Sequence, residues 1–224
     1  MSKSKIFGYR RADGTLGIRN HIAVIPSVDC ANEVAKRIAN QVEHAVALPH
    51  TTGCGTYGDD IEKTFQTLVG LGAHPNVAGV LIVSLGCESI DVDRLILSIL
   101  RRRKGKMIEK IIIQEEHGTS NTISKGVMIA STMARKASML EKSEGYIKDI
   151  IFATECGGSD PTSGLAANPA VGYVVEKIIA MGGSAMLCET REIIGAEHIL
   201  AENAVNNEVA NDLLDVVHEV ESKC

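Results

Sequence analysis

The hydrophobic residues of this chain fall into short continuous runs, separated by longer segments in which apolar and polar residues alternate. Four runs rich in Ile, Val, Leu and Ala are predicted to be buried strands, and they lie at residues 21–27, 45–48, 77–85 and 108–113. The segments between them place apolar residues three and four positions apart, as in an amphipathic helix. We therefore predict helices at residues 29–41, 59–71, 91–102 and 121–141. This alternation of strand and helix indicates a parallel sheet with helices on both faces.

The same pattern starts again after a polar stretch at residues 142–145, which we interpret as a boundary between two lobes. Strands are expected at residues 149–154 and 184–187, and helices at 169–181 and 207–221. Asn168 precedes a proline and is the expected N-cap of the helix at 169. The fold class is therefore α/β, with a Rossmann-like, doubly wound and mostly parallel sheet and the start of a second α/β lobe. We expect a first domain at residues 1–144 and an incomplete second domain at 145–224.

The composition is that of a globular protein and excludes several classes of function. Of the 224 residues, 45% are hydrophobic and 23% are charged, which argues against disorder. Aromatic residues make up only 3% and tryptophan is absent, so the core must be aliphatic. No apolar run approaches the roughly 20 residues that span a bilayer, and the N-terminus lacks the apolar segment of a signal peptide. We expect a cytoplasmic protein with no membrane partner.

The charge of the chain bears on nucleic-acid binding. A net charge of −5 does not favour a nucleic-acid surface, although one basic run, RRRKGK, occupies residues 101–106. We interpret this run as the solvated C-terminus of a helix, where cations suit the helix dipole and glycine ends the helix. A phosphate or RNA patch is the alternative.

The cysteines are expected to be reduced, because disulfides are rare in the cytosol. They are Cys30, Cys54, Cys87, Cys156, Cys188 and Cys224, and no two have the CxxC spacing of a zinc site. Cys54, Cys87 and Cys156 lie beside glycine in loops that follow predicted strands. Ligands of open α/β sheets bind at the carboxyl ends of the strands, where such loops lie. Three thiolates meeting there predict an iron ion or an iron–sulfur cluster, and the alternative is that each cysteine is a small buried residue.

Histidines and carboxylates occupy the same loops. His50 follows a proline at a strand end and is a candidate base or metal ligand, with a solvated loop residue as the alternative. Four carboxylates are candidate acid–base groups or metal ligands, namely Glu155, Asp160, Glu189 and Glu192. Asp160 precedes a proline and fits an Asx turn equally well, and His198 fits either a helix start or a catalytic role. Dinucleotide, P-loop and hydrolase-elbow motifs are absent from the sequence.

A series of motifs runs along the chain. The first half carries GYRRADGTLGIRN at residues 8–20, TGCG at 52–55, HPNV at 74–77 and LGCE at 85–88. The second half carries CGGSD at 156–160, SG at 163–164, ANPA at 167–170, ET at 189–190 and GAEH at 195–198. In this order the motifs resemble those of the altronate/galactarate dehydratase family, to which the sulfolactate sulfo-lyase large subunit is closely similar.

The resemblance implies a lyase that dehydrates a sugar acid such as altronate or galactarate to a 2-keto-3-deoxy acid, with Fe²⁺, Mn²⁺ or another divalent metal. A sulfo-lyase acting on sulfolactate is the alternative, although the cysteine loops at 53–55 and 86–88 favour the sugar-acid branch. On the motif positions, metal ligation is expected from His50, Cys54, Cys87 and Cys156. Substrate binding is expected from Gly157, Ser159, Ser163 and Asn168, and acid–base catalysis from Asp160, Glu189 and His198.

The resemblance also implies partners. Family dehydratases carry a small domain ahead of the first motif and continue past the equivalent of Cys224, so we expect a separate small-domain subunit and a chain that is incomplete alone. A non-catalytic subunit or fragment that needs a partner is therefore a further alternative. The small-molecule partner is expected to be a sugar acid, and the chain is expected to form a homo-oligomer.

Overall fold

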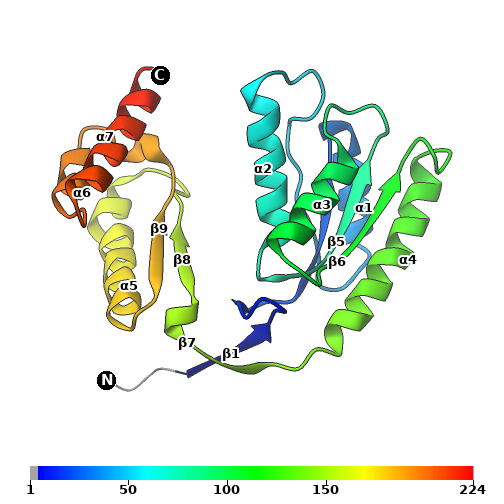
Figure 1. Ribbon diagram of the computed structural model, residues 1–224, viewed down its shortest axis with the longest axis horizontal. Helices are drawn as coiled ribbons and strands as arrows, with labels where there is room; N and C mark the ends of the chain where they lie inside the picture. The colour runs from blue at the N-terminus through cyan, green and yellow to red at the C-terminus, as the bar shows by residue number, and fades with distance from the viewer. Residues whose placement is uncertain (1–4, 224) are drawn as a thin grey trace. The chain divides into compact units, whose positions relative to one another are not determined.

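The computed structural model describes residues 5–223, which form two compact units (Figure 1). The first unit is Lys5–Gly145 and the second begins at Tyr146. Cys224, one of the six cysteines, lies outside the described residues.

The first unit is built on a four-stranded parallel sheet with the strand order β4-β3-β5-β6. Its strands are β3 (His21–Pro26), β4 (Ala45–Ala47), β5 (Val77–Ser84) and β6 (Met107–Ile112). Every residue of β5 is buried, as expected for a central strand whose two faces are both covered by helices. The predicted α/β fold with a parallel sheet is confirmed.

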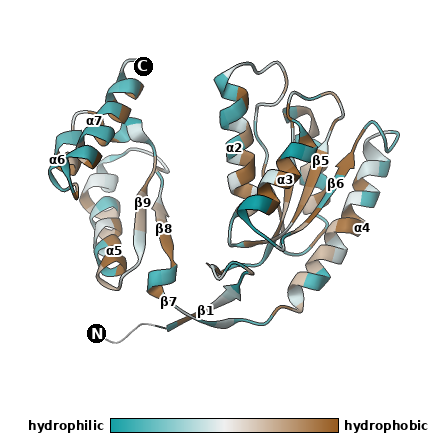
Figure 2. Ribbon diagram, in the orientation of Figure 1, coloured by the Kyte–Doolittle hydropathy of each residue, from teal (hydrophilic) through white to brown (hydrophobic). Residues whose placement is uncertain are grey.

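Two helices cover each face of this sheet. On one face lie α1 (Asn32–Ala39) and α4 (Thr119–Ser138), which contribute Ile38 and Met133 to one buried cluster. On the other lie α2 (Asp59–Ala73) and α3 (Val92–Arg102), which contribute Leu68 and Ile99 to a second cluster. The strands and the inward faces of these helices are hydrophobic, whereas the outward faces are polar (Figure 2). The helix predicted at 29–41 is shorter, because a 3-10 turn at Asp29–Ala31 precedes α1.

The strand order creates a switch point in this sheet. From β3 the chain passes to β4 on one side and then returns to β5 on the other side. Ligands of open α/β sheets bind outside the carboxyl ends of the strands at such a point. The loops that follow β3 and β5 are therefore the parts of the first unit best placed to bind a ligand.

A small sheet of order β2-β1-β7 was not predicted. Its strands come from the beginning and the end of the first unit's sequence. The sheet consists of β1 (Lys5–Arg10), β2 (Leu16–Gly17) and β7 (Ser143–Tyr146). These strands are short, and Gly8 is the one buried residue of β1, so the hydrophobic pattern that marks the other strands is missing. β7 occupies most of the polar stretch that we expected to be only a boundary.

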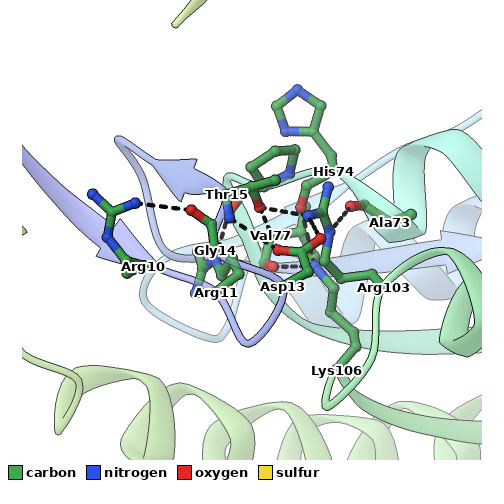
Figure 3. A network of polar contacts seen from close by, with 11 residues as sticks. Arg10, Arg11, Asp13, Gly14, Thr15, Ala73, His74, Val77, Arg103 and Lys106 are labelled. Atoms are coloured by element: carbon green, nitrogen blue, oxygen red, sulfur yellow. Dashed lines mark hydrogen bonds and ion pairs between the residues drawn. The ribbon is translucent and has the colours of Figure 1, made fainter. Parts of the chain in front are cut away.

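The basic run at 101–106 is only partly solvated. Arg101 and Arg102 are exposed at the end of α3, as predicted. Arg103 turns inward and its Nε donates to the carbonyl of Ala73 at 2.8 Å, and Lys106 is only 8% exposed (Figure 3). The interpretation of the whole run as a solvated helix end is therefore wrong for Arg103 and Lys106, because both side chains bond to buried backbone carbonyls.

The second unit holds a parallel pair, β8 (Ile151–Thr154) and β9 (Ser184–Leu187), with Ile151 opposite Ser184. The connection is α5 (Asn168–Ala180), and two further helices follow, α6 (Glu197–Glu202) and α7 (Asn207–Glu221). Shorter helical turns occur at Ile147–Asp149, Ser163–Ala167 and Thr190–Ile193. The predicted strands and the two predicted helices of this half are present.

Asn168 is not an N-cap, which corrects the prediction. The turn at Ser163–Ala167 is a π-helix that runs directly into α5, and Asn168 itself has helical angles, with φ −64° and ψ −44°. Because the chain is already helical before residue 168, no free helix end remains there to be capped. A true N-cap occurs at Asn206, whose side chain accepts from Val209 N at 2.9 Å.

Few residues of the second unit are buried. Among the described residues of this unit, Val217 is the one that is fully buried, whereas Ile151 is 66% exposed and Leu187 is 60% exposed. Its strands therefore carry apolar side chains that the described part of the chain leaves accessible. None of the described helices combines the length and apolar character needed to cross a membrane.

Candidate functional site

The switch point of the first unit is organised around the carboxylate of Glu88. Oε1 of Glu88 accepts hydrogen bonds from Ser27 Oγ and from Ser84 Oγ, each at 2.5 Å. Oε2 accepts from the backbone N–H of Gly86 at 2.7 Å. Ser27 follows β3 and Ser84 ends β5, so one carboxylate joins the carboxyl ends of two neighbouring strands.

These contacts set the charge of Glu88. Partial burial raises its pKa, but the hydrogen bonds from Ser27 and Ser84 outweigh burial, so the pKa of Glu88 lies below its ordinary value. The group is therefore a fixed negative charge within the cysteine loop at 86–88. No role for Glu88 follows from the sequence, in which it is only a carboxylate after a strand.

His50 has a hydrogen-bond partner at each ring nitrogen. Its Nε2 lies 2.8 Å from the carbonyl of Pro26, and its Nδ1 lies 2.8 Å from Thr52 Oγ1. Because a carbonyl only accepts, Nε2 carries the proton and Nδ1 accepts from Thr52. A metal role for His50 stays a prediction, and it would require one of these two bonds to open.

Cys54 and Cys87 lie in loops that touch one another. The backbone N–H of Ser89 donates to the carbonyl of Gly53 at 3.0 Å, which joins the loop after β4 to the loop after β5. Cys54 and Cys87 are exposed and Cys156 is partly exposed, so the alternative that these three cysteines are small buried residues is wrong. Within residues 5–223, however, neither Cys54 nor Cys87 belongs to a group of three converging ligand atoms.

Such a group does occur in the second unit. The ligand atoms of Cys156, Glu189 and Glu192 all lie within 4.8 Å of one another. Cys156 follows β8 and Glu189 follows β9, and since these strands are parallel, both residues lie at the same end of the pair. Oε2 of Glu189 also accepts from Cys156 N at 2.7 Å, which fixes one loop to the other.

Glu189 has an uncommon backbone conformation. With φ 65° and ψ 74° it is left-handed, a region that residues other than glycine, asparagine and aspartate rarely occupy. Strain of this kind often accompanies functional sites, where the surrounding structure holds a side chain in one place. Here the conformation begins the 3-10 helix at Thr190–Ile193, and that helix carries Glu192.

The loop after Cys156 carries three of the predicted site residues in a compact turn. Ser159 Oγ lies 4.0 Å from Cys156 Sγ, and Ser163 Oγ donates to the carbonyl of Gly158 at 3.2 Å. Asp160 Oδ1 accepts from Thr162 N at 2.7 Å, which is the Asx turn considered above. The hydrogen bond from the Thr162 side chain is the main cause that lowers the pKa of Asp160 below its ordinary value.

Three other predicted residues are exposed: Gly157, Asn168 and His198. In the described part of the chain, no hydrogen bond or ion pair links the side chains of Asn168 or His198 to the Cys156 group. Their roles stay predictions, as do the roles of Ser159, Ser163, Asp160 and Glu189. Glu192 was one of four candidate carboxylates in the sequence, and the 3-10 turn after Glu189 is what distinguishes it.

The donor set of the Cys156 group suits a divalent metal ion. One thiolate and two carboxylates form a mixed S/O set that leaves positions for a substrate or water, as catalytic metal sites do. An iron–sulfur cluster is held mainly by thiolates, and Cys188, the other described cysteine of this unit, is outside the group. Within the second unit the donors therefore fit a single ion better than a cluster.

Sequence comparisons agree with the division of the chain. A profile described as the second domain of D-galactarate dehydratase/altronate hydrolase matches residues 8–138. A profile described as the C-terminal part of D-galactarate/altronate dehydratase matches residues 147–224. The Glu88 cluster lies in the first match and the Cys156 group lies in the second.

Individual relatives include more than one kind of lyase. The chain is 37% identical, over 90% of its length, to (2R)-sulfolactate sulfo-lyase subunit beta of Chromohalobacter salexigens, and it covers 51% of that protein. It is 30% identical to altronate dehydratase of Bacillus subtilis, over 95% of this chain and 44% of the relative. Galactarate dehydratase (L-threo-forming) of Escherichia coli is 28% identical, over 93% of this chain and 43% of the relative. The chain thus spans about half the length of these curated relatives, and it belongs to the galactarate/altronate dehydratase family of lyases.

Proposed function

We propose that this chain forms part of a metal-dependent lyase that removes water from a sugar acid, such as altronate or galactarate, to give a 2-keto-3-deoxy acid. The observation that carries the proposal is the convergence of Cys156, Glu189 and Glu192 in a chain of the dehydratase family. Fe²⁺ or Mn²⁺ would suit this mixed set of ligands. The residues of the first unit that we predicted as ligands, His50, Cys54 and Cys87, remain candidates for the same ion.

The reaction needs two proton transfers. The C2 proton of a 2,3-dihydroxy acid is weakly acidic, and a metal ion supplies Lewis acidity that stabilises the negative charge developing on the neighbouring carboxylate. In the proposal His198 takes the C2 proton, the C3 hydroxyl leaves with a proton from an acidic group, and the enol product rearranges to the ketone. General acid and base groups typically contribute about 10²–10⁴-fold each.

The remaining residues of the loop would bind substrate oxygens. Ser159 lies beside Cys156, and its hydroxyl can donate to a substrate carboxylate or hydroxyl. The backbone at Gly157, and the side chains of Ser163 and Asn168, are the other proposed contacts. Asp160 is held ionised in its Asx turn, which suits a proton acceptor better than a proton donor.

A sulfo-lyase acting on sulfolactate is the second candidate. It is favoured by the 37% identity to the sulfo-lyase subunit, which exceeds the identity to the altronate and galactarate dehydratases. Both reactions begin with removal of the proton next to the carboxylate and differ in the group that leaves C3. The same metal and base would serve either, so the two candidates differ only in how the leaving group is bound.

We also propose a partner subunit. The sulfo-lyase relative is named as subunit beta, and this chain covers about half of it. The proposed partner is a small-domain polypeptide, with a homo-oligomer of this chain and a cytoplasmic location as further parts of the proposal. A chain that only binds substrate, and relies on its partner for the chemistry, is the non-catalytic alternative.

Metal binding can be tested on the chain itself. Titration with Co²⁺ under anaerobic conditions should give a thiolate-to-metal charge-transfer band, and that band should be lost in Cys156→Ser. Glu192→Gln should weaken Co²⁺ binding by about tenfold or more, in the range found when groups supporting a metal are removed. Cys188→Ser is the matched control, since it removes a half-buried thiol of the same unit outside the group. Equal Co²⁺ binding by wild type and Cys156→Ser would refute the site.

The substrate class can be tested with the chain together with its small-domain partner. Altronate, galactarate and sulfolactate would be supplied separately, with 2-keto acid formation and sulfite release as the two readouts. Keto-acid formation from altronate or galactarate without sulfite supports the dehydratase, whereas sulfite release from sulfolactate supports the second candidate. Turnover that survives in both Cys156→Ser and His198→Ala would contradict the proposed roles of these residues.

A further inference from the structure

A second cluster of charged groups lies at the opposite end of the first unit's sheet. β3, β5 and β6 are parallel, and the cluster surrounds the residues where they begin, such as Val77 and Met107. The Glu88 cluster, by contrast, follows the residues where the strands end. The two sites are therefore separated by the length of the sheet, and the proposed lyase chemistry uses none of the residues described next.

This end of the sheet contains a cavity of about 290 Å³ with a strongly basic lining. Among the described residues, six cationic side chains and no carboxylate line it; the six are Arg10, Arg11, Arg103, Lys104, Lys106 and Lys136. The nearest acidic group in the network of Figure 3 is Asp13, which pairs with Arg103. Positive charge thus exceeds negative charge around this cavity.

The arginines are largely occupied by protein acceptors. Arg11 donates to the carbonyl of Pro75 at 2.7 Å, to Asn20 Oδ1 at 2.9 Å and to the carbonyl of Arg19 at 3.1 Å. Arg103 bonds to Ala73 O, and its Nη1 pairs with Asp13 and also donates to Thr15. Each of these two guanidinium groups uses three of its five N–H donors in these bonds, which fixes the geometry of the wall.

The lysines differ in this respect. Lys106 Nζ donates to the carbonyls of His74, at 3.0 Å, and Val77, which leaves one of its three N–H donors. Lys104 and Lys136 line the cavity and have no hydrogen bond or ion pair within residues 5–223. Lys104 and Lys136 therefore keep all of their N–H donors, and their compact ammonium groups can bind phosphate as point charges.

The titration behaviour of the buried groups agrees with an excess of positive charge. Burial is the largest cause that lowers the pKa of Lys106 to about 7, and the neighbouring Arg11 and Arg103 lower it further. Burial followed by Lys106 and Arg103 likewise lowers the pKa of His74. An anion bound beside these groups would relieve their mutual repulsion.

We propose that this cavity is a binding site for a small, free phosphate-class anion, such as inorganic phosphate or pyrophosphate, held by Lys104, Lys106 and Lys136. The volume of about 290 Å³ lies at the lower end of the usual range for ligand pockets, about 300–1,000 Å³, and so suits a small ligand. The site would be a structural or regulatory anion site, built from residues that the proposed lyase chemistry does not use.

Isothermal titration calorimetry of the full chain at constant ionic strength tests the proposal. Pyrophosphate and phosphate should bind saturably, and the double variant Lys104→Ala/Lys136→Ala should weaken binding by about tenfold or more. The matched control is Arg102→Ala/Arg135→Ala, which removes two exposed cations that lie outside the cavity, Arg102 at the end of α3 and Arg135 in α4. Its affinity should stay within about twofold of wild type, because long-range attraction is screened by salt.

Three results would overturn the proposal. The first is the absence of saturable binding of either phosphate compound to the wild-type chain. The second is an equal loss of affinity in the two double variants, which would show general charge attraction in place of a site. The third is tighter binding of citrate than of pyrophosphate, which would show that the cavity prefers carboxylates. Thermal melts of both variants verify that each is folded, as expected for substitutions of exposed side chains.

Discussion

Ser27 and Glu88 are joined by a hydrogen bond of 2.5 Å that connects the loops after β3 and β5 at the switch point of the sheet. Ser27 is fully buried, and the two loops are 61 residues apart in sequence. The same carboxylate oxygen accepts from Ser84. One ionised side chain thus orders the part of the first unit where ligands of this fold class bind, and it does so next to the exposed Cys87.

Replacing Glu88 by glutamine should destabilise the first unit. Glutamine has one carbonyl oxygen in place of two carboxylate oxygens, so either the two serines or Gly86 N would face an NH₂ group. The expected loss is about 1–3 kcal/mol in the free energy of unfolding, measured with urea. Glu109→Gln, at an exposed position of β6, is the control and should change little.

The effect of Glu88→Gln should depend on pH. Since the folded pKa of Glu88 is below its ordinary value of 4.5, its stabilisation is complete above about pH 4.5 and is lost as the pH falls through the folded pKa. The difference between wild type and Glu88→Gln should therefore shrink below pH 4.5. A difference that stays constant from pH 7 to pH 3 would contradict the ionised, hydrogen-bonded carboxylate.

Lys106 should make stability depend on pH in the same direction as Glu88 does, but in a higher pH range. Its folded pKa of about 7 lies below its ordinary value of 10.5, so the unfolded chain binds more protons between these values. Stability relative to Lys106→Met should then rise from about pH 7 towards pH 10, with a limiting slope of about 1.4 kcal/mol per pH unit. Urea unfolding at a series of pH values measures this. The exposed Lys104→Met is the control, and equal slopes for wild type and Lys106→Met would refute the assignment.

The strands of the large sheet could be predicted because they are continuous apolar runs, a pattern that burial between two layers of helices explains. Val77–Ser84 is buried along its whole length, and only a strand covered on both faces has that pattern at that length. β1 could not be predicted in this way, because its pairing with β2 and β7 depends on backbone bonds between short, partly polar segments. The prediction of an N-cap at Asn168 was wrong for a related reason, since the helical turn that precedes it has no sequence signal of its own.

The candidate site was predictable in its general location only. Cys156 and Glu189 both follow predicted strands, so their proximity is a consequence of a parallel pair. Glu192 belongs to the Cys156 group because the left-handed backbone of Glu189 begins the turn that carries it. The sequence does not indicate that conformation, because left-handed backbone is expected at glycine and not at glutamate. The bonds of His50 to Pro26 and Thr52 likewise depend on a loop conformation that hydrophobic patterning does not determine.

The first motif of the chain has a structural explanation in Arg11. Its guanidinium group bonds to three acceptors, in residues 19, 20 and 75, and so ties the N-terminal hairpin to the loop before β5. A lysine at this position cannot reproduce the planar fork. Arg11→Lys should therefore lower the free energy of unfolding by about 1–3 kcal/mol. Arg19→Lys is the control, because among the described residues the side chain of Arg19 donates only to the adjacent carbonyl of Ile18, and it should cost less than about 0.5 kcal/mol. Equal losses in the two variants would contradict this role of Arg11.

Gly53 should be sensitive to substitution for a reason that its neighbour Gly55 lacks. Both glycines have positive φ, +95° and +65°, so an alanine at either position costs about 1–2 kcal/mol of backbone strain. At Gly53 an added Cβ would also lie 2.6 Å from the carbonyl oxygen of Ser27 and 2.9 Å from Val28 Cα, whereas at Gly55 it would meet nothing within 4 Å. Gly53→Ala should therefore be the more destabilising by a further 1–3 kcal/mol or so.

Because Gly53 O also accepts from Ser89 N, the same change should alter the rate at which Cys54 and Cys87 react with a thiol reagent. Equal stabilities and equal thiol reactivities in Gly53→Ala and Gly55→Ala would show that the loop after β4 does not pack against the end of β3.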